Sequence, residues 1–362
     1  MARPNRCEIL AEDEVAVLHV FSRCVRRAFL CGVDPLSGAC YDHRKQFIQD
    51  RLEALAAVFA IDVMAFAVMS NHFHLVLRTR PDIVSGWSDE EVARRWWALF
   101  PKRRTRKRTP SEPRQNELDM LTSDPKKIAE LRRRLSSVSW LMRCLCESIA
   151  RQANAEDEVT GRFFEGRFKS VRLNDEASVL ACMAYVDLNP VRARLAEAPE
   201  ASEFTSIYQR ILAAAESSAG HAVEVDHSSS ASTISTQSTE ASESVESVAD
   251  SGPIPDCWLS PIELARDHCD ESGDPCHRAS NRGCVPISLN EYLMLLDWTG
   301  RQIVNGKRGR IPTNMAPILE RLGMTRSVWV ETVRRFGHRP MKPSAPRDES
   351  ASSTPANATS AA

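Results

Sequence analysis

The most informative stretch of this chain reads Ala67-Val68-Met69-Ser70-Asn71-His72-Phe73-His74-Leu75-Val76-Leu77. Its Val and Leu residues predict a buried strand, and Ser70-Asn71 predicts a break in the chain just before that strand. Successive side chains of a strand point to opposite faces, so His72 and His74 share one face and Phe73 lies on the other. Two imidazoles spaced in this way can hold one metal ion. A structural pair of hydrogen-bonded histidines is the alternative.

The segments around this strand alternate between strand and helix patterns. Apolar residues recur every second position in the predicted strands and every third or fourth position in the predicted helices. The helix predicted at 175–187 is expected to begin at a cap, Asn174 or Asp175, and to end near Pro190. The predicted strands are 15–31 (one strand or two), 61–68, 71–79 and 162–173, and the predicted helices are 43–60, 88–99, 126–153 and 175–187.

Composition divides the 362 residues into four parts. Residues 10–212 carry the strands and helices above. Residues 213–256 hold no Lys or Arg, eight acidic residues and few large apolar ones, which predicts a disordered linker. Residues 257–342 are expected to form a small helical domain from helices at 288–298, 313–322 and 325–336. The Ser- and Ala-rich tail 343–362 is expected to be disordered.

The charge and hydropathy patterns exclude some classes of protein. Residues 1–212 and 257–362 are each mildly basic, so the net charge of −1 does not argue against a nucleic-acid partner. No apolar run reaches the ~18 residues of a membrane span, and the N-terminus lacks an apolar signal core. We therefore expect a cytoplasmic protein without a membrane partner, whose eleven cysteines are reduced thiols.

A strongly basic run, Lys102 to Arg108, follows the helix predicted at 88–99. Six of its seven residues are Lys or Arg, and such clusters bind nucleic-acid phosphates by releasing counterions. A solvated surface loop is the simpler interpretation. The basic residues predicted to contact DNA are Arg23, Arg26, Arg27, Lys102, Arg103, Arg104, Arg106, Lys107, Arg108, Arg167, Lys169 and Arg192.

A second segment that could carry chemistry is Tyr185-Val186-Asp187-Leu188-Asn189-Pro190. Tyr185 and Asn189 are four residues apart and would share one face of a helix. A phenol is a poor nucleophile unless it is activated, and a divalent metal can polarise the phosphodiester that it attacks. His72, His74 and the amide oxygen of Asn189 would suit Mg²⁺ or Mn²⁺ with retained waters. A tyrosine packed on the core is the alternative.

Three motifs in this order resemble one family. They are His72-Phe73-His74 after Met-Ser-Asn, Gly161-Arg162-Phe163-Phe164-Glu165-Gly166-Arg167-Phe168-Lys169-Ser170, and Tyr185 to Ala193. Together they resemble the single-tyrosine HUH transposases (His, hydrophobic, His), and within them the REP-associated tyrosine transposases. The resemblance covers about 10–212. Arg194 departs from it, since glycine is often found at that position.

The resemblance implies a ferredoxin-like α+β domain with a central antiparallel sheet and flanking helices. His72 and His74 match the metal-binding pair, and Asn189 matches the position of a third ligand. Tyr185 matches the nucleophile, which forms a 5′-phosphotyrosine on single-stranded or hairpin DNA and frees a 3′-OH. The implied activity is cleavage and rejoining of DNA strands. Related enzymes occur as monomers and as dimers, so a homodimer, and a tyrosine acting in cis or in trans, stay open.

Several alternatives remain at this point. The chain could be a non-catalytic DNA-binding regulator on the same fold, or a metal-dependent phosphodiesterase that uses water. The region after 257 could read DNA as a helix-turn-helix or could be a structural cap. The spacing of the cysteines and histidines there fits no common zinc pattern, which leaves unrelated surface residues as the simpler explanation; these are His268, Cys269, Cys276, His277 and Cys284.

Overall fold

The computed structural model describes residues 14–25, 30–34, 38–106, 111–225, 256–264 and 278–322. Chain contacts divide the molecule into one compact unit, Met1–Ile318, and a second unit, Leu319–Ala362. Only Leu319 to Leu322 of the second unit are among the described residues. The sheet, the histidines and Tyr185 all belong to the first unit.

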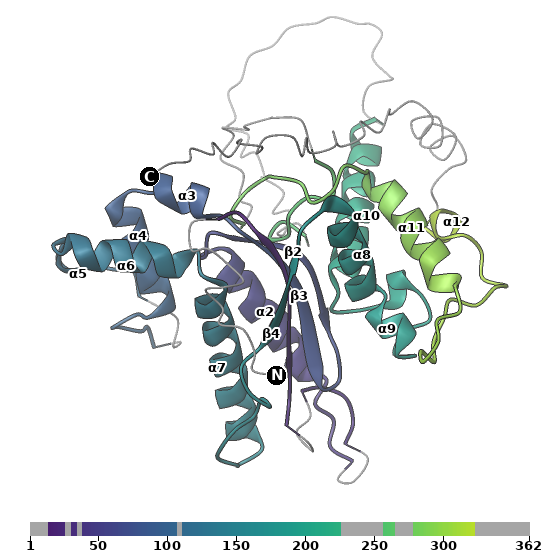
Figure 1. Ribbon diagram of the computed structural model, residues 1–362, viewed down its shortest axis with the longest axis horizontal. Coiled ribbons are helices and arrows are strands. Elements are labelled where there is room, and N and C mark those ends of the chain that lie inside the picture. Colours follow the sequence, from purple (N-terminus) through teal and green to yellow (C-terminus); the bar gives the residue numbers. More distant parts are fainter. Residues whose placement is uncertain are drawn as a thin grey trace, which may run out of the picture. The chain divides into compact units, whose positions relative to one another are not determined.

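The first unit is built on a four-stranded antiparallel sheet with the order β2-β3-β1-β4. In the chain, β1 is followed by helix α2, the hairpin β2–β3, further helices and β4, which is the ferredoxin-like arrangement (Figure 1). The expected α+β fold is therefore confirmed. The strands are β1 Val17–Arg23, β2 Ile61–Val68, β3 His72–Thr79 and β4 Lys169–Leu173.

Helices cover both faces of this sheet. Helices α2 and α7 pack on one face, and α8 and α10 pack on the other (Figure 1). The longer helices are α2 His43–Ala56, α4 Asp89–Leu99, α5 Gln115–Thr122, α6 Pro125–Leu135, α7 Val138–Glu156, α8 Glu176–Asp187, α10 Ser206–Val225 and α11 Leu289–Arg301. The short ones are α3 Pro81–Gly86, α9 Asn189–Arg192, α12 Ile318–Arg321 and the 3₁₀ helix Pro199–Ala201.

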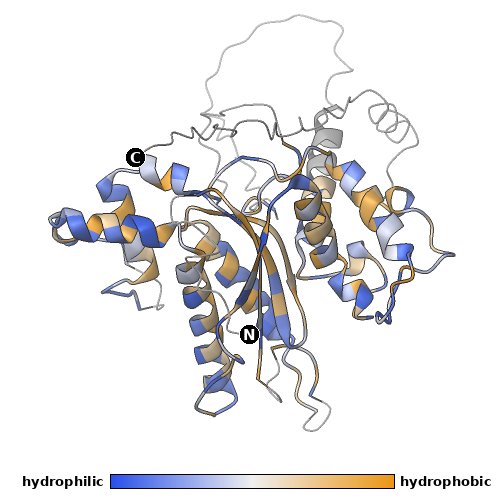
Figure 2. Cartoon of the chain, viewed as in Figure 1, coloured by the Kyte–Doolittle hydropathy of each residue, from blue (hydrophilic) through white to orange (hydrophobic). Residues whose placement is uncertain are grey.

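The alternation of side chains along β1 and β3 gives the two faces different roles. Leu18, Val20, Phe73 and Leu75 are buried in the core shared with α2 and α7. Their neighbours in sequence, the histidines among them, lie on the face covered by α8. Figure 2 shows hydrophobic residues concentrated in the sheet and in the helices against it, with hydrophilic residues on α5 and α6. The core thus holds the histidine-bearing strands in place from behind.

Helix α8 begins and ends as its sequence predicts. Asp175 is the N-cap: its carboxylate accepts the backbone N–H of Ser178, and Ser178 Oγ returns a hydrogen bond to the backbone of Asp175. The helix ends at Asp187, three residues before Pro190, which has no N–H to continue the hydrogen-bond pattern. Leu188 keeps helical dihedral angles and leads directly into α9.

The single helix predicted over 126–153 is wrong, because two helices, α6 and α7, occupy this region. Ser136 and Ser137 separate them, with Ser137 in an extended conformation. The carbonyl of Leu135 accepts the N–H of Ala60 at 2.9 Å instead of continuing a helix. A tertiary hydrogen bond therefore ends α6 at a point where the apolar spacing continues.

The two strands predicted to be long are shorter than expected. Within 15–31 the described strand is Val17–Arg23, and within 162–173 only Lys169–Leu173 forms a strand. Residues 163–165 instead lie beside the end of β1, where Val25 N–H donates to the Phe163 carbonyl and Glu165 N–H to the Arg23 carbonyl. This irregular segment carries the middle one of the three motifs to the edge of the histidine face.

The expected boundaries after residue 212 also differ from the structure. Helix α10 continues to Val225, so the segment expected to be a linker from 213 begins as helix, and 226–255 lie outside the described residues. The described residues between 256 and 318 belong to the compact unit of the sheet instead of forming a domain of their own. Trp258 packs on Phe66 with ring centroids 5.0 Å apart, and Ser260 N–H donates to the Val63 carbonyl.

Buried polar groups reinforce this attachment of the C-terminal segment. Arg78 pairs with Asp62 inside the molecule and also donates to the carbonyl of Gly283. Asp187 of α8 is fully buried and accepts hydrogen bonds from Ser206 of α10 and from the hydroxyl of Tyr292 of α11. Polar groups buried in this way are tolerated only when they are hydrogen-bonded or paired, so the segment after 256 is part of the same folded unit.

Three further observations concern expectations from composition. No helix within the described residues is both long and apolar enough to cross a membrane. The eight cysteines in the described part of the chain are free thiols. The helix predicted at 313–322 is limited to Ile318–Arg321, and the one predicted at 325–336 lies outside the described residues.

Candidate functional site

The two histidines of β3 face α8, and Tyr185 of α8 lies directly above them. The ring of Tyr185 meets the ring of His74 edge-on, with centroids 5.6 Å apart. His72 and His74 are 4.9 Å apart between ring centroids. Tyr185 keeps 43% of its surface exposed although its helix is packed on the sheet. The tyrosine therefore lies against the histidines and is also open to an incoming ligand.

A pocket of about 370 Å³ is open at this point. It brings together residues that the sequence predicted separately, from the histidine strand, the middle motif and the tyrosine helix. The basic residues Arg23, Arg167 and Lys169, all predicted to contact DNA, are exposed and line it. Its full lining is Phe21, Ser22, Arg23, His72, His74, Glu165, Gly166, Arg167, Lys169 and Tyr185.

Each histidine of β3 has one ring nitrogen engaged by a neighbour. The Nδ1 atom of His72 lies 2.7 Å from the amide oxygen of Asn71, which can only accept a hydrogen bond. Nδ1 of His72 therefore carries the proton, and Nε2 keeps its lone pair. The Nδ1 atom of His74 lies 2.9 Å from Nε2 of His19 on β1. His19 is a part of this site that sequence reasoning missed.

Both histidines of the predicted pair are held in the neutral form. Burial, with a smaller effect of the Arg23 and Lys307 charges, lowers the pKa of His72 to about 4. Burial and the neighbouring histidines lower the pKa of His74 to about 3. Burial also lowers the pKa of His19. A neutral imidazole is the form that ligates a metal, so the environment suits this role at neutral pH.

Asn189 lies one helical turn beyond Tyr185, because Leu188 joins α8 and α9 in helical conformation. Its side chain is buried, and it is not among the residues that line the pocket of Tyr185. One buried side-chain atom of each of His74 and Asn189 makes no hydrogen bond within the described residues: Nε2 of His74 and Nδ2 of Asn189. Buried polar atoms without a partner are rare, and an absent ligand is one explanation for them.

The donor atoms of these side chains decide whether the residues fit a divalent metal. His72 and His74 can both offer a neutral imidazole, and the terminal amide of Asn189 can present its oxygen when it is turned over. This donor set of two nitrogens and one oxygen fits the expected ion. Among the described residues, no group of three His, Cys, Asp or Glu side chains is arranged to hold a metal. A site here would therefore depend on the amide and on bound water or phosphate oxygens.

The remaining predicted DNA contacts are distributed differently. Lys102, Arg104 and Arg106 are exposed, while Arg103 pairs with Glu117 and lies over the Trp97 ring. None of these four lines the pocket of Tyr185. The remaining four, Arg26, Arg27, Lys107 and Arg108, lie outside the described residues.

Arg192 does not fit its predicted role. Its side chain is buried, and the guanidinium donates to the carbonyls of Gln302 at 2.7 Å and Thr299 at 2.6 Å. A guanidinium with its donors directed at buried carbonyls does not face solvent, so the prediction of a DNA contact is wrong for this residue. Nothing in the local sequence distinguishes it from an exposed arginine, because its partners lie more than 100 residues away.

Lys307 is a second site residue that the sequence did not identify. Its ammonium lies 5.6 Å from the centroid of the Tyr185 ring. In the sequence, Lys307 is one of three basic residues in the segment 307–310, between the helices predicted at 288–298 and 313–322. Its place beside the tyrosine depends on the packing of α11 and the following turn against α8 and α9. The five cysteine and histidine positions considered for zinc lie outside the described residues, apart from Cys284, which is buried.

Comparison with known proteins adds a distant likeness to a solved structure. No protein-family model and no curated protein matches the chain. Among solved structures, the chain is similar to a REP-associated tyrosine transposase bound to a REP hairpin, with 10% sequence identity and a TM-score of 0.30. The match covers 63% of this chain and 93% of that chain. A likeness this distant does not assign the chain to a family.

Proposed function

We propose that the protein is a DNA strand-cleaving and strand-joining enzyme of the single-tyrosine HUH transposase type. The observation that supports it is the meeting of Tyr185, His72 and His74 in one pocket whose rim carries Arg23, Arg167 and Lys169. An exposed phenol above two neutral imidazoles, with cations around them, suits attack on a phosphodiester. The histidine motif, the middle motif and the tyrosine motif come from three separate parts of the chain.

In the proposed reaction, Oη of Tyr185 attacks the scissile phosphorus of a single DNA strand. The new bond is a tyrosine-phosphate ester, and the bond that breaks is the one from phosphorus to the 3′ oxygen. That oxygen takes up a proton and leaves as a free 3′-OH, while the phenol proton passes to solvent. Rejoining is the reverse step with a 3′-OH as the nucleophile, so the bond energy is conserved.

The chain's own residues prepare this step in three ways. Helix α8 aims Tyr185 at the histidine face, and the core behind β3 holds that face in place. The cations on the rim hold the phosphates of the strand. His72, His74 and Asn189 would hold Mg²⁺ or Mn²⁺, which when bound polarises the phosphoryl oxygens and neutralises developing charge.

A covalent-trapping experiment tests this proposal. The full chain is mixed with labelled single-stranded hairpin DNA from the flanks of its own gene, with Mg²⁺ or Mn²⁺, and run on a denaturing gel. We expect a protein–DNA adduct that is lost in Tyr185→Phe, in His74→Ala and with a chelator. Tyr208→Phe, at a half-buried tyrosine on α10, is the matched control and should keep the adduct.

The other outcomes separate the competing functions. If cleavage continues in Tyr185→Phe and no adduct forms, water is the nucleophile. That outcome would overturn the assignment of the tyrosine. Binding of all flanking substrates with no cleavage would point to a regulator on the same fold. An adduct that survives Tyr185→Phe would place the nucleophile elsewhere in the chain.

A further inference from the structure

The segment that follows α11 forms a basic turn packed against α9. It leaves the helix at Gln302 and reverses direction at Gly306, whose φ of +77° is in the region that favours glycine. The N–H of Lys307 closes the turn on the carbonyl of Val304. The turn then presents Lys307, Arg308 and Arg310 at the surface, with the intervening Gly309 buried.

Several specific contacts fix this turn to α9. The buried guanidinium of Arg192 donates to the carbonyls of Thr299 and Gln302, and the carbonyl of Arg192 accepts the N–H of Gly309 at 3.1 Å. A Cβ atom on Gly309 would lie 1.8 Å from the carbonyl oxygen of Val191, so only glycine allows this approach. The position of the turn is therefore set by buried groups on both partners.

Arg194 adds an independent indication. Its φ is +60°, a left-handed conformation that is uncommon for a residue with a side chain. In this conformation its Nε donates to the carbonyl of Arg308 at 2.7 Å. Non-glycine residues keep such conformations only where their surroundings enforce them, and these cluster at ligand sites. Here the strained residue supplies both a contact to the turn and a fourth cation beside it.

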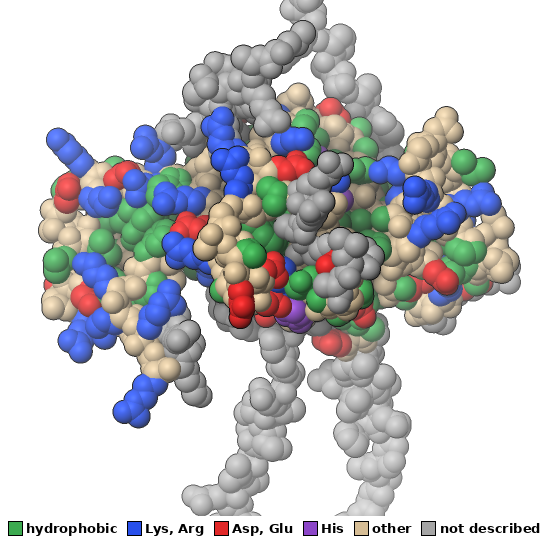
Figure 3. Space-filling view, turned by 90° about the horizontal axis from the view of Figure 1, so that it is seen from below, with side chains coloured by type: hydrophobic (Ala, Val, Ile, Leu, Met, Phe, Trp, Pro, Cys, Tyr) green, Lys and Arg blue, Asp and Glu red, His purple; other side chains and the backbone are tan. Residues whose placement is uncertain are grey.

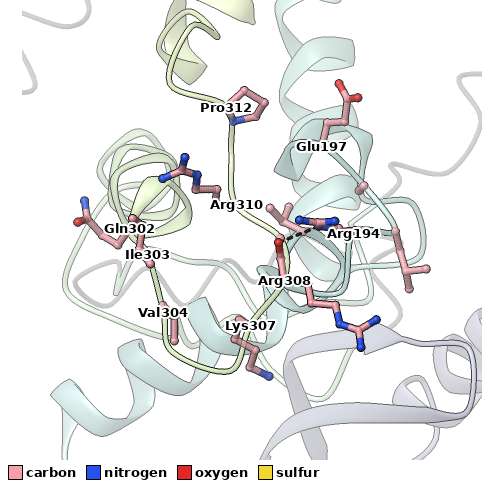
Figure 4. Close-up of a pocket in the computed structure, with 13 residues that line it drawn as sticks. Arg194, Glu197, Gln302, Ile303, Val304, Lys307, Arg308, Arg310 and Pro312 are labelled. Atoms are coloured by element: carbon pink, nitrogen blue, oxygen red, sulfur yellow. Dashed lines mark hydrogen bonds between the residues drawn. The ribbon is translucent and has the colours of Figure 1, made fainter.

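The turn, Val191 of α9 and the residues 194–197 that follow α9 line an open pocket of about 580 Å³ (Figure 4). Four cations line it, Arg194, Lys307, Arg308 and Arg310, against one carboxylate, Glu197. The pocket also has exposed apolar side chains, and Figure 3 shows Lys and Arg side chains grouped over this part of the molecule. The apolar lining residues with the largest exposed fractions are Leu195 (56%), Ile303 (79%) and Val304 (42%).

This pocket adjoins the site of Tyr185 through one residue. Lys307 lines the basic pocket, and its ammonium lies 5.6 Å from the ring centroid of Tyr185, which lines the histidine pocket. In Figure 4, Lys307 and Arg308 extend to the same side of the turn. Cations with apolar surface between them match the backbone and bases of a single nucleic-acid strand. The net positive charge of the lining favours an anionic ligand over an uncharged one of the same size.

We infer that the turn 302–312 and the segment 191–197, at the end of α9 and after it, form a binding site for single-stranded DNA that continues the strand path from Tyr185. Arg194, Arg308 and Arg310 bind backbone phosphates of nucleotides next to the scissile one, and Lys307 binds the phosphate nearest the tyrosine. The direction of the strand path rests on the proposed function, whereas the binding itself does not require cleavage.

Binding in the absence of chemistry tests this inference. The full chain carrying Tyr185→Phe is titrated, with a chelator present, into a fluorescently labelled single-stranded oligonucleotide from the gene flank, at several salt concentrations. We expect Arg308→Ala with Arg310→Ala to raise the Kd about tenfold. The slope of log K against log salt should fall by roughly 0.7 for each phosphate that the variant no longer binds.

Two further variants keep the result interpretable. Lys126→Ala with Arg151→Ala removes two exposed cations from α6 and α7 that line neither pocket, and should leave Kd and slope unchanged. Gly309→Ala keeps all four cations but displaces the turn, and should weaken binding while circular dichroism stays native. Equal weakening in the control pair and in the Arg308/Arg310 pair, or no weakening in either, would overturn the inference.

The same variants separate this inference from the proposed function. An adduct that forms normally in the trapping assay, together with unchanged metal-free binding in the Arg308/Arg310 pair, would leave the function standing and reject the pocket. Weakened binding in that pair, with no adduct from the unmodified chain, would keep the pocket and reject the function.

Discussion

Nε2 of His19 on β1 and Nδ1 of His74 on β3 are 2.9 Å apart, and their rings are stacked. The two strands are neighbours in the sheet. His19 lies opposite Val76, which follows His74 as the next residue on the same face of β3. The bond occupies Nδ1 of His74 and leaves Nε2 buried without a partner in the described structure. A histidine whose second nitrogen is held in this way presents its first nitrogen in a fixed orientation.

We predict that His19→Phe weakens divalent-metal binding by about 10- to 100-fold, because His74 loses the partner that orients it. Isothermal titration of Mn²⁺ into the full chain measures the change. His19→Gln, whose amide oxygen can accept from Nδ1 of His74, should restore part of the affinity. His43→Phe, at an exposed histidine of α2, is the control. Unchanged Mn²⁺ affinity in His19→Phe would rule out a positioning role.

The lowered pKa values of His72 and His74 predict how the stability of the metal-free protein depends on pH. The unfolded chain binds protons at these residues near pH 6.5, whereas the folded chain binds them only near pH 4 and pH 3. The free energy of unfolding should therefore fall as pH decreases from about 6.5 toward 4. The slope contributed by each histidine is at most about 1.4 kcal/mol per pH unit.

Urea unfolding with a chelator at pH 7, 6 and 5 measures this decrease. His72→Asn with His74→Asn should lose less stability than the unmodified chain over the same interval. Tyr208→Phe changes a half-buried side chain of α10 without removing a histidine, and should follow the unmodified chain. Parallel curves for the double variant and the unmodified chain would contradict the neutral state of the pair.

The hydroxyl of Tyr292 predicts a measurable link between α11 and α8. It donates to the fully buried carboxylate of Asp187 at 2.6 Å. Tyr292→Phe should lower the free energy of unfolding by about 1–3 kcal/mol, because it leaves a buried acceptor unpaired. Denaturant unfolding checks this, with Tyr208→Phe as the matched removal of a hydroxyl. A change below about 0.5 kcal/mol would mean that water replaces the missing donor.

The exposed cations after α4 predict an electrostatic effect on DNA binding. Replacing Lys102, Arg104 and Arg106 by alanine should weaken binding of single-stranded DNA and reduce the slope of log K against log salt, by roughly 0.7 for each phosphate that these side chains bind. The measurement is anisotropy at several salt concentrations. Alanine at Arg94, Lys126 and Arg151, three cations on helix surfaces, is the control. An unchanged slope would identify 102–106 as a solvated loop.

Local patterns in the sequence were sufficient for the elements that carry the site. Alternation along 67–77 placed His72 and His74 on one face, and the hairpin strands were predicted within a residue of their observed ends. The cap and the proline set the limits of α8, and so the position of Tyr185 on it. These features depend on interactions within a few residues of chain, which is why the sequence alone contains them.

The tertiary structure decided the rest of the site. The partnership of His19 with His74 joins residues 55 positions apart, and Lys307 reaches Tyr185 across more than 100. The same packing buried Arg192, ended α6 at Leu135 through a bond from Ala60, and attached the residues after 256 to the sheet. Strand pairing and helix packing choose partners by shape and burial over the whole unit, and no local spacing records that choice.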